Sequence, residues 1–199
     1  MDKYLEAVTL RGRHVQLEPL ALEHLDALIA AAIDGELWRL WYTQVPPPQR
    51  MRAYIGNFLA RKEKGESLPF AVRNLHTGAV IGHTAFYEIV PEYRRLALGY
   101  TWYAASAQRT AINTESKRLL LEYAFETLQC VRVEFHTHWL NHRSRQAIER
   151  LGAKQEGVLR SHRILPDGTL RDTVMFSIIE PEWPAIGQHL QFLLDSYSS

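Results

Sequence analysis

The sequence has almost no cysteine, since Cys130 is the only one among its 199 residues. An intramolecular disulfide and a zinc site made of four thiolates are therefore excluded. No apolar run approaches the roughly 20 residues that a membrane-spanning helix needs. The first few residues also lack the apolar core of a signal peptide. We therefore expect a cytoplasmic protein without a membrane partner.

The sequence also lacks an excess of charge of either sign. Its 23 Lys and Arg residues nearly balance its 22 Asp and Glu residues, so the formal net charge is +1. A chain so close to neutrality does not bind nucleic acid through bulk charge, and we expect no nucleic-acid partner. Hydrophobic residues make up 46% and charged residues 23% of the chain, which indicates a globular protein. The length predicts a single domain over residues 1–199.

Hydrophobic spacing predicts an ordered series of helices and strands. The predicted helices are residues 21–32, 49–64, 114–128, 144–151 and 182–197. The predicted strands are residues 9–17, 68–73, 80–89, 96–103, 131–137, 154–161 and 172–179. Pro166-Asp167-Gly168 favours a tight hairpin between the last two strands. Hairpins joined to helical crossovers predict a mixed sheet with helices on its faces, in the α/β (α+β) class.

The first candidate site is the junction between the strand at 96–103 and the helix that follows it. The first turn of a helix presents backbone N–H groups and the positive end of the helix dipole, so it can bind an anion. Asn113 is predicted as the N-cap, Glu115 adds a favourable negative charge to the first turn, and Arg109 is placed to contact a phosphate. The same pattern is typical of an ordinary capped helix, and both interpretations stay open.

The second candidate site is Asn141-His142-Arg143-Ser144, which precedes the last core helix. The amide of Asn141 can bind another amide, and the hydroxyl of Ser144 can donate a proton. Either side chain can instead simply cap the helix.

Several short motifs occur together in a specific order and spacing. They are Arg11-Gly12-Arg13-His14-Val15-Gln16-Leu17-Glu18-Pro19-Leu20, Gly99-Tyr100, Asn113-Thr114-Glu115-Ser116-Lys117-Arg118-Leu119-Leu120-Leu121, Asn141-His142-Arg143-Ser144, Leu151-Gly152-Ala153, Glu156-Gly157-Val158-Leu159-Arg160 and Asp167-Gly168-Thr169-Leu170-Arg171-Asp172. Through them the chain resembles the GCN5-related N-acetyltransferases (GNATs) over residues 8–179. Within that family it is most similar to the RimJ/RimL-like branch, whose members acetylate protein N-termini.

The resemblance implies the GNAT fold, with a mostly antiparallel sheet of six to seven strands and helices on both faces. It implies acetyl-CoA as donor, a primary amine as acceptor, direct attack in a ternary complex, and no metal. In such enzymes two neighbouring strands splay apart around the pantetheine arm. The residues implied to bind the donor are Tyr100, Thr101 and Trp102 on the first of these strands, the pyrophosphate loop Gln108, Arg109, Thr110, Ala111, Ile112 and Asn113, and the amide of Asn141.

One departure from the family pattern concerns the pyrophosphate loop, which usually carries two small residues. Here Ala111 and Asn113 occupy those positions. Asn tolerates a left-handed backbone, but Ala adopts it only at a cost of about 1 kcal/mol. We therefore expect the loop to follow a different path.

Acetyl transfer needs a group that assists the thiolate leaving group and a group that accepts the proton of the amine. Ser144 is the predicted acid, because similar enzymes place a Ser or Tyr near the sulfur. Glu134 is the predicted base, acting through water from the polar face of its strand. The alternative for Glu134 is that it has no catalytic role and is a surface carboxylate that pairs with Arg132 or a lysine.

Two residues are predicted to bind the acceptor. Asp172 either binds the acceptor amine or caps the last hairpin. Trp38, which precedes Trp41 and Tyr42, either walls the acceptor groove, as in similar enzymes, or packs in the core.

His136 and His138 share a strand face with Glu134, which is a spacing that metal sites also use. We predict no metal there, because in the implied fold this face opens to solvent or substrate.

The leading hypothesis is an N-acetyltransferase whose acceptor is a protein or peptide N-terminus. A second hypothesis keeps the donor and changes the acceptor to a polyamine, an amino acid or an antibiotic. An acidic groove favours a cationic small molecule, whereas an open groove favours a peptide. A third hypothesis is a non-catalytic module that only binds an acyl-CoA. Whether the protein forms a homodimer stays open.

Overall fold

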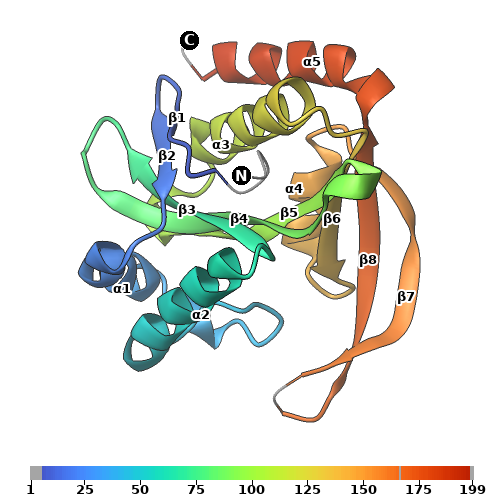
Figure 1. Ribbon diagram of the computed structural model, residues 1–199. Helices are drawn as coiled ribbons and strands as arrows, with labels where there is room; N and C mark the ends of the chain where they lie inside the picture. Colours follow the sequence, from blue (N-terminus) through green and yellow to red (C-terminus); the bar gives the residue numbers. More distant parts are fainter. Residues whose placement is uncertain (1–5, 166, 198–199) are drawn as a thin grey trace.

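The computed structural model describes residues 6–165 and 167–197, in which helices flank an eight-stranded sheet (Figure 1). The strands are β1 (Leu10–Arg11), β2 (Val15–Pro19), β3 (Ser67–Asn74), β4 (Val80–Val90), β5 (Arg95–Tyr103), β6 (Arg132–His138), β7 (Lys154–Ile164) and β8 (Leu170–Ile179). Their order in the sheet is β1-β2-β3-β4-β5-β6-β8-β7. All neighbouring pairs are antiparallel except β5 and β6, which run parallel. The predicted mixed, mostly antiparallel sheet is confirmed, with one strand more than predicted.

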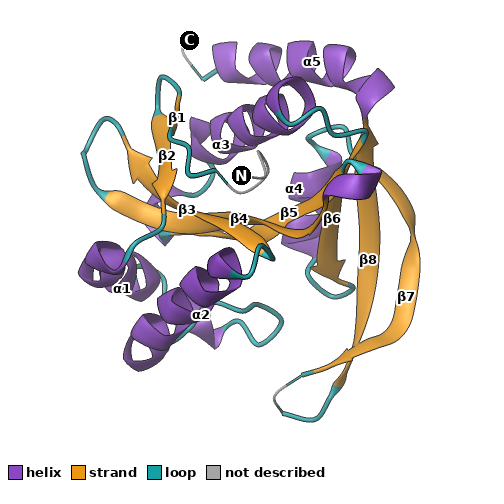
Figure 2. Cartoon of the chain, viewed as in Figure 1, coloured by secondary structure: helices purple, strands orange, loops and turns teal. Residues whose placement is uncertain are grey.

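The helices cover both faces of the sheet (Figure 2). They are α1 (Leu25–Ile33), α2 (Met51–Glu63), α3 (Ala111–Glu122), α4 (His142–Glu149) and α5 (Trp183–Asp195). α1 and α2 lie on one face, whereas α3, with α5 packed against it, lies on the other. α4 follows β6 and contacts it. None of the helices in the described part of the chain is long and apolar enough to cross a membrane.

The additional strand arises because the first predicted strand is in fact a hairpin of β1 and β2. The Glu115 carboxylate on α3 accepts hydrogen bonds from the backbone N–H groups of Arg13, His14 and Val15, at 2.8, 2.7 and 2.8 Å. A side chain at Gly12 would place its Cβ 2.4 Å from Glu115 Cδ, so glycine lets the carboxylate approach the turn. Glu115 therefore stabilises the hairpin turn. The prediction that Glu115 is a favourable charge in the first turn of the helix is wrong.

Large aromatic side chains from four strands fill the core. Phe70, Phe86, Phe135 and Phe176 are almost completely buried. The rings of Phe70 and Phe86 meet edge to face, with 6.0 Å between their centroids, a favourable geometry for aromatic pairs. Cys130 is buried with them, which agrees with its role as a small apolar residue.

β7 and β8 form a long hairpin that extends beyond the rest of the sheet (Figure 1). At its turn, Asp167 accepts a hydrogen bond from the Thr169 N–H at 3.0 Å, and Gly168 has a φ of +84°, which favours glycine. The predicted hairpin is therefore present. Pro166, the first residue of the predicted turn, lies outside the described residues.

Candidate active site

β5 and β6 separate partway along their length. Their parallel pairing ends at Ala97 and Glu134. β5 continues to Tyr103, and β6 continues to His138 beside its other neighbour, β8. Within the described residues, the rest of β5 has no strand partner on this side, so its backbone N–H and C=O groups face an open edge. The two strands splay apart, as the resemblance to GNATs implied.

A β-bulge in β5 lies where the two strands separate. His83 of β4 pairs with Trp102, whereas Ala85 pairs with Gly99, so β5 contains one extra residue in this interval. The bulge includes Tyr100, whose φ of +51° is left-handed. The Nδ1–H of His83 donates to the Tyr100 carbonyl at 3.1 Å and supports this backbone. Because a bulge bends its strand and increases the local twist, it accounts for the divergence of β5 from β6.

The space between the separated strands is a cleft of about 700 Å³. Most residues predicted to bind the donor or to act as the acid line it: Tyr100, Thr101, Trp102, Gln108, Arg109, Thr110, Asn113, Asn141 and Ser144. Ala111 and Ile112 do not line the cleft, because their side chains are buried under the first turn of α3.

The loop before α3 differs in detail from the prediction. α3 begins at Ala111, three residues earlier than predicted, and its N-cap is Thr110 instead of Asn113. Thr110 Oγ1 accepts a hydrogen bond from the Ile112 N–H at 3.3 Å. The left-handed residue is Arg109, with a φ of +60°. Ala111 and Asn113 are both helical, so the predicted strain at Ala111 is wrong.

The N-terminus of α4 also faces the cleft. Asn141 is its N-cap, and the Oδ1 atom accepts a hydrogen bond from the Ser144 N–H at 3.1 Å. The cap uses only the oxygen of Asn141, so the amide hydrogens can bind another partner. Arg143, in the first turn, and Arg150 line the cleft as well, and Arg150 donates to Thr114 Oγ1 on α3 at 2.9 Å. Positive charge therefore gathers where α3 and α4 meet the cleft.

Lys117, to which the sequence gave no role, lies on the α3 side of the cleft. Its side chain is buried, and Nζ donates to Thr101 Oγ1 at 2.5 Å. Burial lowers the pKa of Lys117 to about 7, because the loss of water disfavours the charged ammonium. One feature of the sequence could have indicated that Lys117 faces the cleft. It lies one helical turn after Asn113, so both residues share one face of α3.

Glu134, the predicted base, does not line the cleft. Its carboxylate bonds to His136 Nε2 at 3.2 Å and accepts hydrogen bonds from Arg132 at 2.8 Å and Arg95 at 3.4 Å. The bond with His136 and the two arginines lower the pKa of Glu134 to about 2. Such an acidic carboxyl group is a weak base, so the structure favours the alternative of a carboxylate paired with Arg132.

His136 does line the cleft, next to Glu134. An ionised carboxylate can only accept hydrogen bonds, so the Nε2–H of His136 donates to Glu134. In the neutral ring Nδ1 then carries the lone pair, and it has no hydrogen-bond partner among the described residues. The Glu88 carboxylate lies 3.8 Å from Nδ1, too far for a hydrogen bond. This is the geometry of a base whose orientation is set by a carboxylate.

Glu88, Glu134 and His136 bring one ligand atom each within 4.8 Å of one another. Both carboxylates already pair with arginines, Glu88 with Arg163 at 3.3 Å. This positive charge opposes a bound cation.

The two residues predicted to bind the acceptor lie outside the cleft. Asp172 accepts hydrogen bonds from Arg160 Nε at 2.5 Å and from the Ser161 N–H at 2.7 Å, which fits the alternative of a hairpin contact. Trp38 packs against the core, whereas Tyr42, which follows it closely, lines the cleft. Of the predicted aromatic group Trp38, Trp41 and Tyr42, only Tyr42 is among the described residues that line the cleft.

The cleft is lined by basic side chains and by no acidic one within the described residues. The basic residues other than histidine are Arg109, Lys117, Arg143, Arg150, Arg163 and Arg171. For a chain with a net charge of only +1, this distribution concentrates positive potential in one place and favours an anionic ligand.

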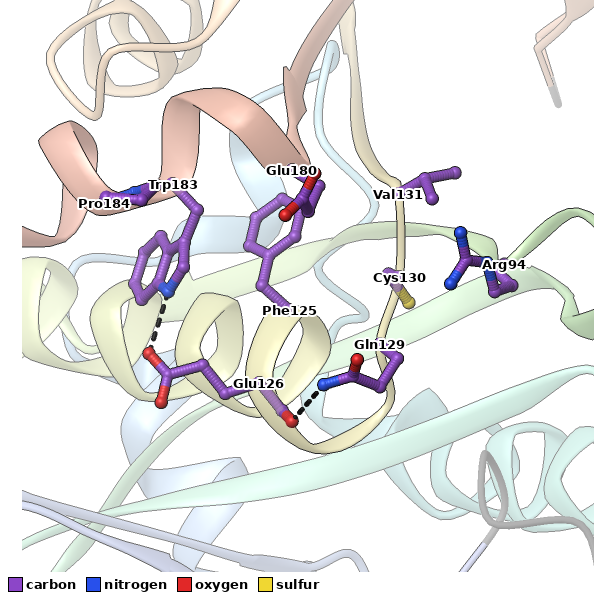
Figure 3. Close-up of a pocket in the computed structure, with 9 residues that line it drawn as sticks. All are labelled: Arg94, Phe125, Glu126, Gln129, Cys130, Val131, Glu180, Trp183 and Pro184. Carbon is purple, nitrogen blue, oxygen red and sulfur yellow. Dashed lines mark hydrogen bonds between the residues drawn. The ribbon is translucent and has the colours of Figure 1, made fainter.

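A second hollow, of about 450 Å³, lies beside the turn that continues α3 (Figure 3). Two of its side chains donate hydrogen bonds to Glu126. Trp183 Nε1 donates to Glu126 at 2.8 Å, and Gln129 donates to the Glu126 carbonyl at 2.7 Å. This hollow shares no lining residue with the cleft, which remains the candidate active site.

A comparison with protein families identifies this arrangement. The sequence model of the Acetyltransferase (GNAT) domain matches residues 14–154. The chain belongs to the GNAT family. The matched segment contains β5, β6, α3 and α4, the elements that bound the cleft.

Individual GNAT relatives agree with this assignment. The Bacillus subtilis protein named "Putative ribosomal N-acetyltransferase YdaF" is 31% identical over 109 residues, which cover 55% of this chain and 58% of that protein. A GCN5-related N-acetyltransferase from Brucella melitensis is 32% identical, with a TM-score of 0.87, over 95% of this chain and 86% of that one. Mycobacterium smegmatis RimJ, in complex with CoA-disulfide, is 20% identical, with a TM-score of 0.77, over 94% of this chain and 93% of that one.

These findings confirm the predicted GNAT family, and the name of YdaF, which includes ribosomal N-acetyltransferase, agrees with the predicted branch. The likeness to RimJ concerns the fold. The chain matches little more than half the length of YdaF.

Proposed function

We propose that this protein transfers the acetyl group of acetyl-CoA to the primary amine at the N-terminus of a protein or peptide, by direct attack in a ternary complex. The observation that carries the proposal is the open edge of β5 beside the N-termini of α3 and α4. An open strand edge pairs with the amides of an extended arm, and helix N-termini bind phosphates. A pantetheine arm joined to phosphates has both features.

The side chains at this end of the cleft fit the donor. Tyr100, Thr101 and Trp102 lie on the part of β5 that has no strand partner on the cleft side among the described residues. The Asn141 amide hydrogens are available to the pantetheine arm, and Arg109 lies in the loop next to the first turn of α3. The altered pyrophosphate loop does not oppose this fit, because its left-handed residue is Arg109 and the helix start is regular.

The comparisons support the same donor and a protein acceptor. The RimJ structure holds coenzyme A as a disulfide, and the name of YdaF includes ribosomal N-acetyltransferase. We extend both properties to this chain as part of the proposal.

Ser144 is the proposed acid. It lines the cleft from the first turn of α4, where its hydroxyl can donate a hydrogen bond to the sulfur as the thiolate leaves. The positive end of the α4 dipole stabilises the same negative charge. Because a thiolate is a fairly good leaving group, a hydrogen bond suffices and full ionisation of the serine is unnecessary.

His136 replaces Glu134 as the proposed base. Its Nδ1 is buried and has no hydrogen-bond partner among the described residues, so its lone pair is available to accept the amine proton once the acceptor or a water molecule contacts it. Glu134 then acts as a positioning residue, because it fixes the tautomer and stabilises the imidazolium that forms. An N-terminal amine has a pKa near 8, so only about a tenth of it is neutral at pH 7, and a base gives a moderate advantage.

The absence of acidic residues from the described lining of the cleft favours a peptide over a polyamine or a cationic antibiotic. Such a cation would meet arginine side chains, among them Arg163 and Arg171, without a compensating carboxylate in the described lining.

The test is release of thiol from acetyl-CoA with three acceptors: a hexapeptide with a free α-amine, the same peptide after N-acetylation, and spermidine. We expect release with the free peptide alone. If acetyl-CoA raises the Tm but no acceptor gives thiol, the protein is a binding module and the proposed activity is wrong. Release with spermidine alone would favour the small-amine acceptor.

A further inference from the structure

Arg171, on β8, is a buried cation for which the described residues supply neither a hydrogen bond at Nε nor an ion pair. Its side chain lines the cleft and the residue is only 8% exposed. Its Nε atom has no hydrogen-bond partner, and no carboxylate of the described residues forms an ion pair with it. A buried guanidinium that is left unpaired is unfavourable, because it has lost water without gaining an acceptor. Such a group in an open cleft indicates a place for an anion.

Two carboxylates in this region, on the residue after Arg171 and beside Arg163, are already engaged. Asp172 holds Arg160, and Glu88 holds Arg163. Arg163 stands opposite Arg171 in the β7–β8 hairpin and adds a second positive charge. Burial, and then this like charge, lower the pKa of Arg171, but an arginine still stays protonated at neutral pH. The hairpin therefore presents an excess of positive charge to the cleft.

Arg171 lies near Tyr87, which in turn contacts the proposed base. Its electrostatic neighbours include Tyr87 and Tyr100. The Tyr87 ring meets the His136 ring edge to face, with 5.7 Å between centroids, and covers Gly99. By contrast, the arginines suited to the donor phosphates come from the start of α3 and from α4. The charge of Arg171 therefore acts at the acceptor, next to the reacting amine.

We propose that Arg171 binds a carboxylate of the acceptor, so that the protein selects amines with an acidic group close to the reacting nitrogen. This inference rests on the proposed function and specifies its substrate class. Two kinds of acceptor carry such a group: a peptide with an acidic side chain at its second position, and a free amino acid with its own α-carboxylate. A guanidinium binds either through two parallel N–H···O bonds, which give both strength and direction.

The test measures kcat/KM by thiol release with three hexapeptides that differ only at the second residue, which is Glu, Gln or Lys. Free serine and serinamide form a second pair, which shows whether an α-carboxylate serves instead. For the wild type we expect a preference for Glu over Gln of about tenfold or more, the size of a charge-assisted hydrogen bond, and the lowest value for Lys. A preference for serine over serinamide, with equal rates for the peptides, would identify the free amino acid as the source of the carboxylate.

The same ratios are then measured in Arg171→Gln and Arg171→Lys. In Arg171→Gln we expect the Glu peptide to fall to the level of the Gln peptide, with unchanged affinity for acetyl-CoA by calorimetry. Arg171→Lys keeps the positive charge but loses the two parallel N–H donors of the guanidinium. We expect this variant to keep part of the preference for Glu over Gln. Lys154→Gln is the matched control, since it removes one positive charge from an exposed ion pair on the same hairpin. It should leave every ratio unchanged.

Because the readout is a ratio of two substrates for one protein, a partial loss of folded Arg171→Gln does not alter it. Turnover with equal rates across both acceptor series overturns the inference and leaves the proposed function intact. A carboxylate preference that survives in Arg171→Gln also overturns it. Absence of thiol release with all five acceptors overturns the proposed function, and the inference with it.

Discussion

Replacement of Lys117 by methionine is expected to remove part of the pH dependence of stability. Burial lowers the pKa of Lys117 to about 7 in the folded protein, whereas an unfolded chain has the ordinary lysine value of about 10.4. Between these values the unfolded state binds more protons than the folded state. The free energy of unfolding of the wild type therefore rises with pH in this interval. Methionine fills a similar volume and cannot titrate, so this contribution disappears.

The magnitude follows from linkage between proton binding and unfolding. One pKa unit corresponds to about 1.4 kcal/mol. From pH 7, where the folded lysine is half protonated, to pH 9.5, the wild type gains about 3 kcal/mol that Lys117→Met does not gain. The quantity to measure is the unfolding free energy of the wild type minus that of the variant. Other titrating groups, such as the buried tyrosines, cancel in this difference.

The assay is urea unfolding, followed by tryptophan fluorescence, at three pH values from 7 to 9.5 and without acetyl-CoA. Leu119→Met is a suitable control, because Leu119 is partly buried on the same helix and carries no charge. Its difference from the wild type should stay constant with pH. A rise of less than about 1 kcal/mol for Lys117→Met would show that water reaches the ammonium and would refute the reasoning.

Four further changes test other assignments. His136→Ala is expected to lower kcat/KM about 100-fold at pH 7 and much less at pH 9, where an amine with a pKa near 8 is neutral without help; equal losses at both pH values would exclude a base. Ser144→Ala should lower kcat more than it weakens acetyl-CoA binding in calorimetry, and unchanged turnover would remove Ser144 from the acid role. Arg109→Glu should weaken binding of coenzyme A more than binding of a pantetheine analogue without phosphates, and equal losses would argue against a phosphate contact. Glu115→Gln should lower the unfolding free energy in urea by about 2–4 kcal/mol, because three charge-assisted hydrogen bonds weaken; a loss below about 1 kcal/mol would contradict the role of Glu115 in the hairpin turn.

Features with local causes could be predicted from the sequence. The cap of α4 depends on two residues three positions apart, Asn141 and Ser144, and such spacing is visible in the chain. The alternation of β6 and the turn at Gly168 are local in the same way. The splay of β5 from β6 followed from the resemblance to GNATs and not from periodicity.

Features that depend on distant partners could not be predicted. Thr110 and Asn113 are both good caps, and the sequence alone does not choose between them. Strand alternation places Glu134 and His136 on one face, but the arginines that lower the pKa of Glu134, and so make it the poorer candidate base, come close to it only in the folded chain. The role proposed for Arg171 could not be predicted from the motif that contains it. Only the folded structure shows that its Nε atom is buried without a hydrogen-bond partner among the described residues.

The contact between Glu115 and the first hairpin also orders events during synthesis. The N–H groups of residues 13–15 leave the ribosome about a hundred residues before the carboxylate that accepts their hydrogen bonds. The nascent chain therefore carries this turn without its acceptor until α3 has emerged and packed. One edge of the sheet is completed only after the middle of the polypeptide has been translated, although that edge is made first.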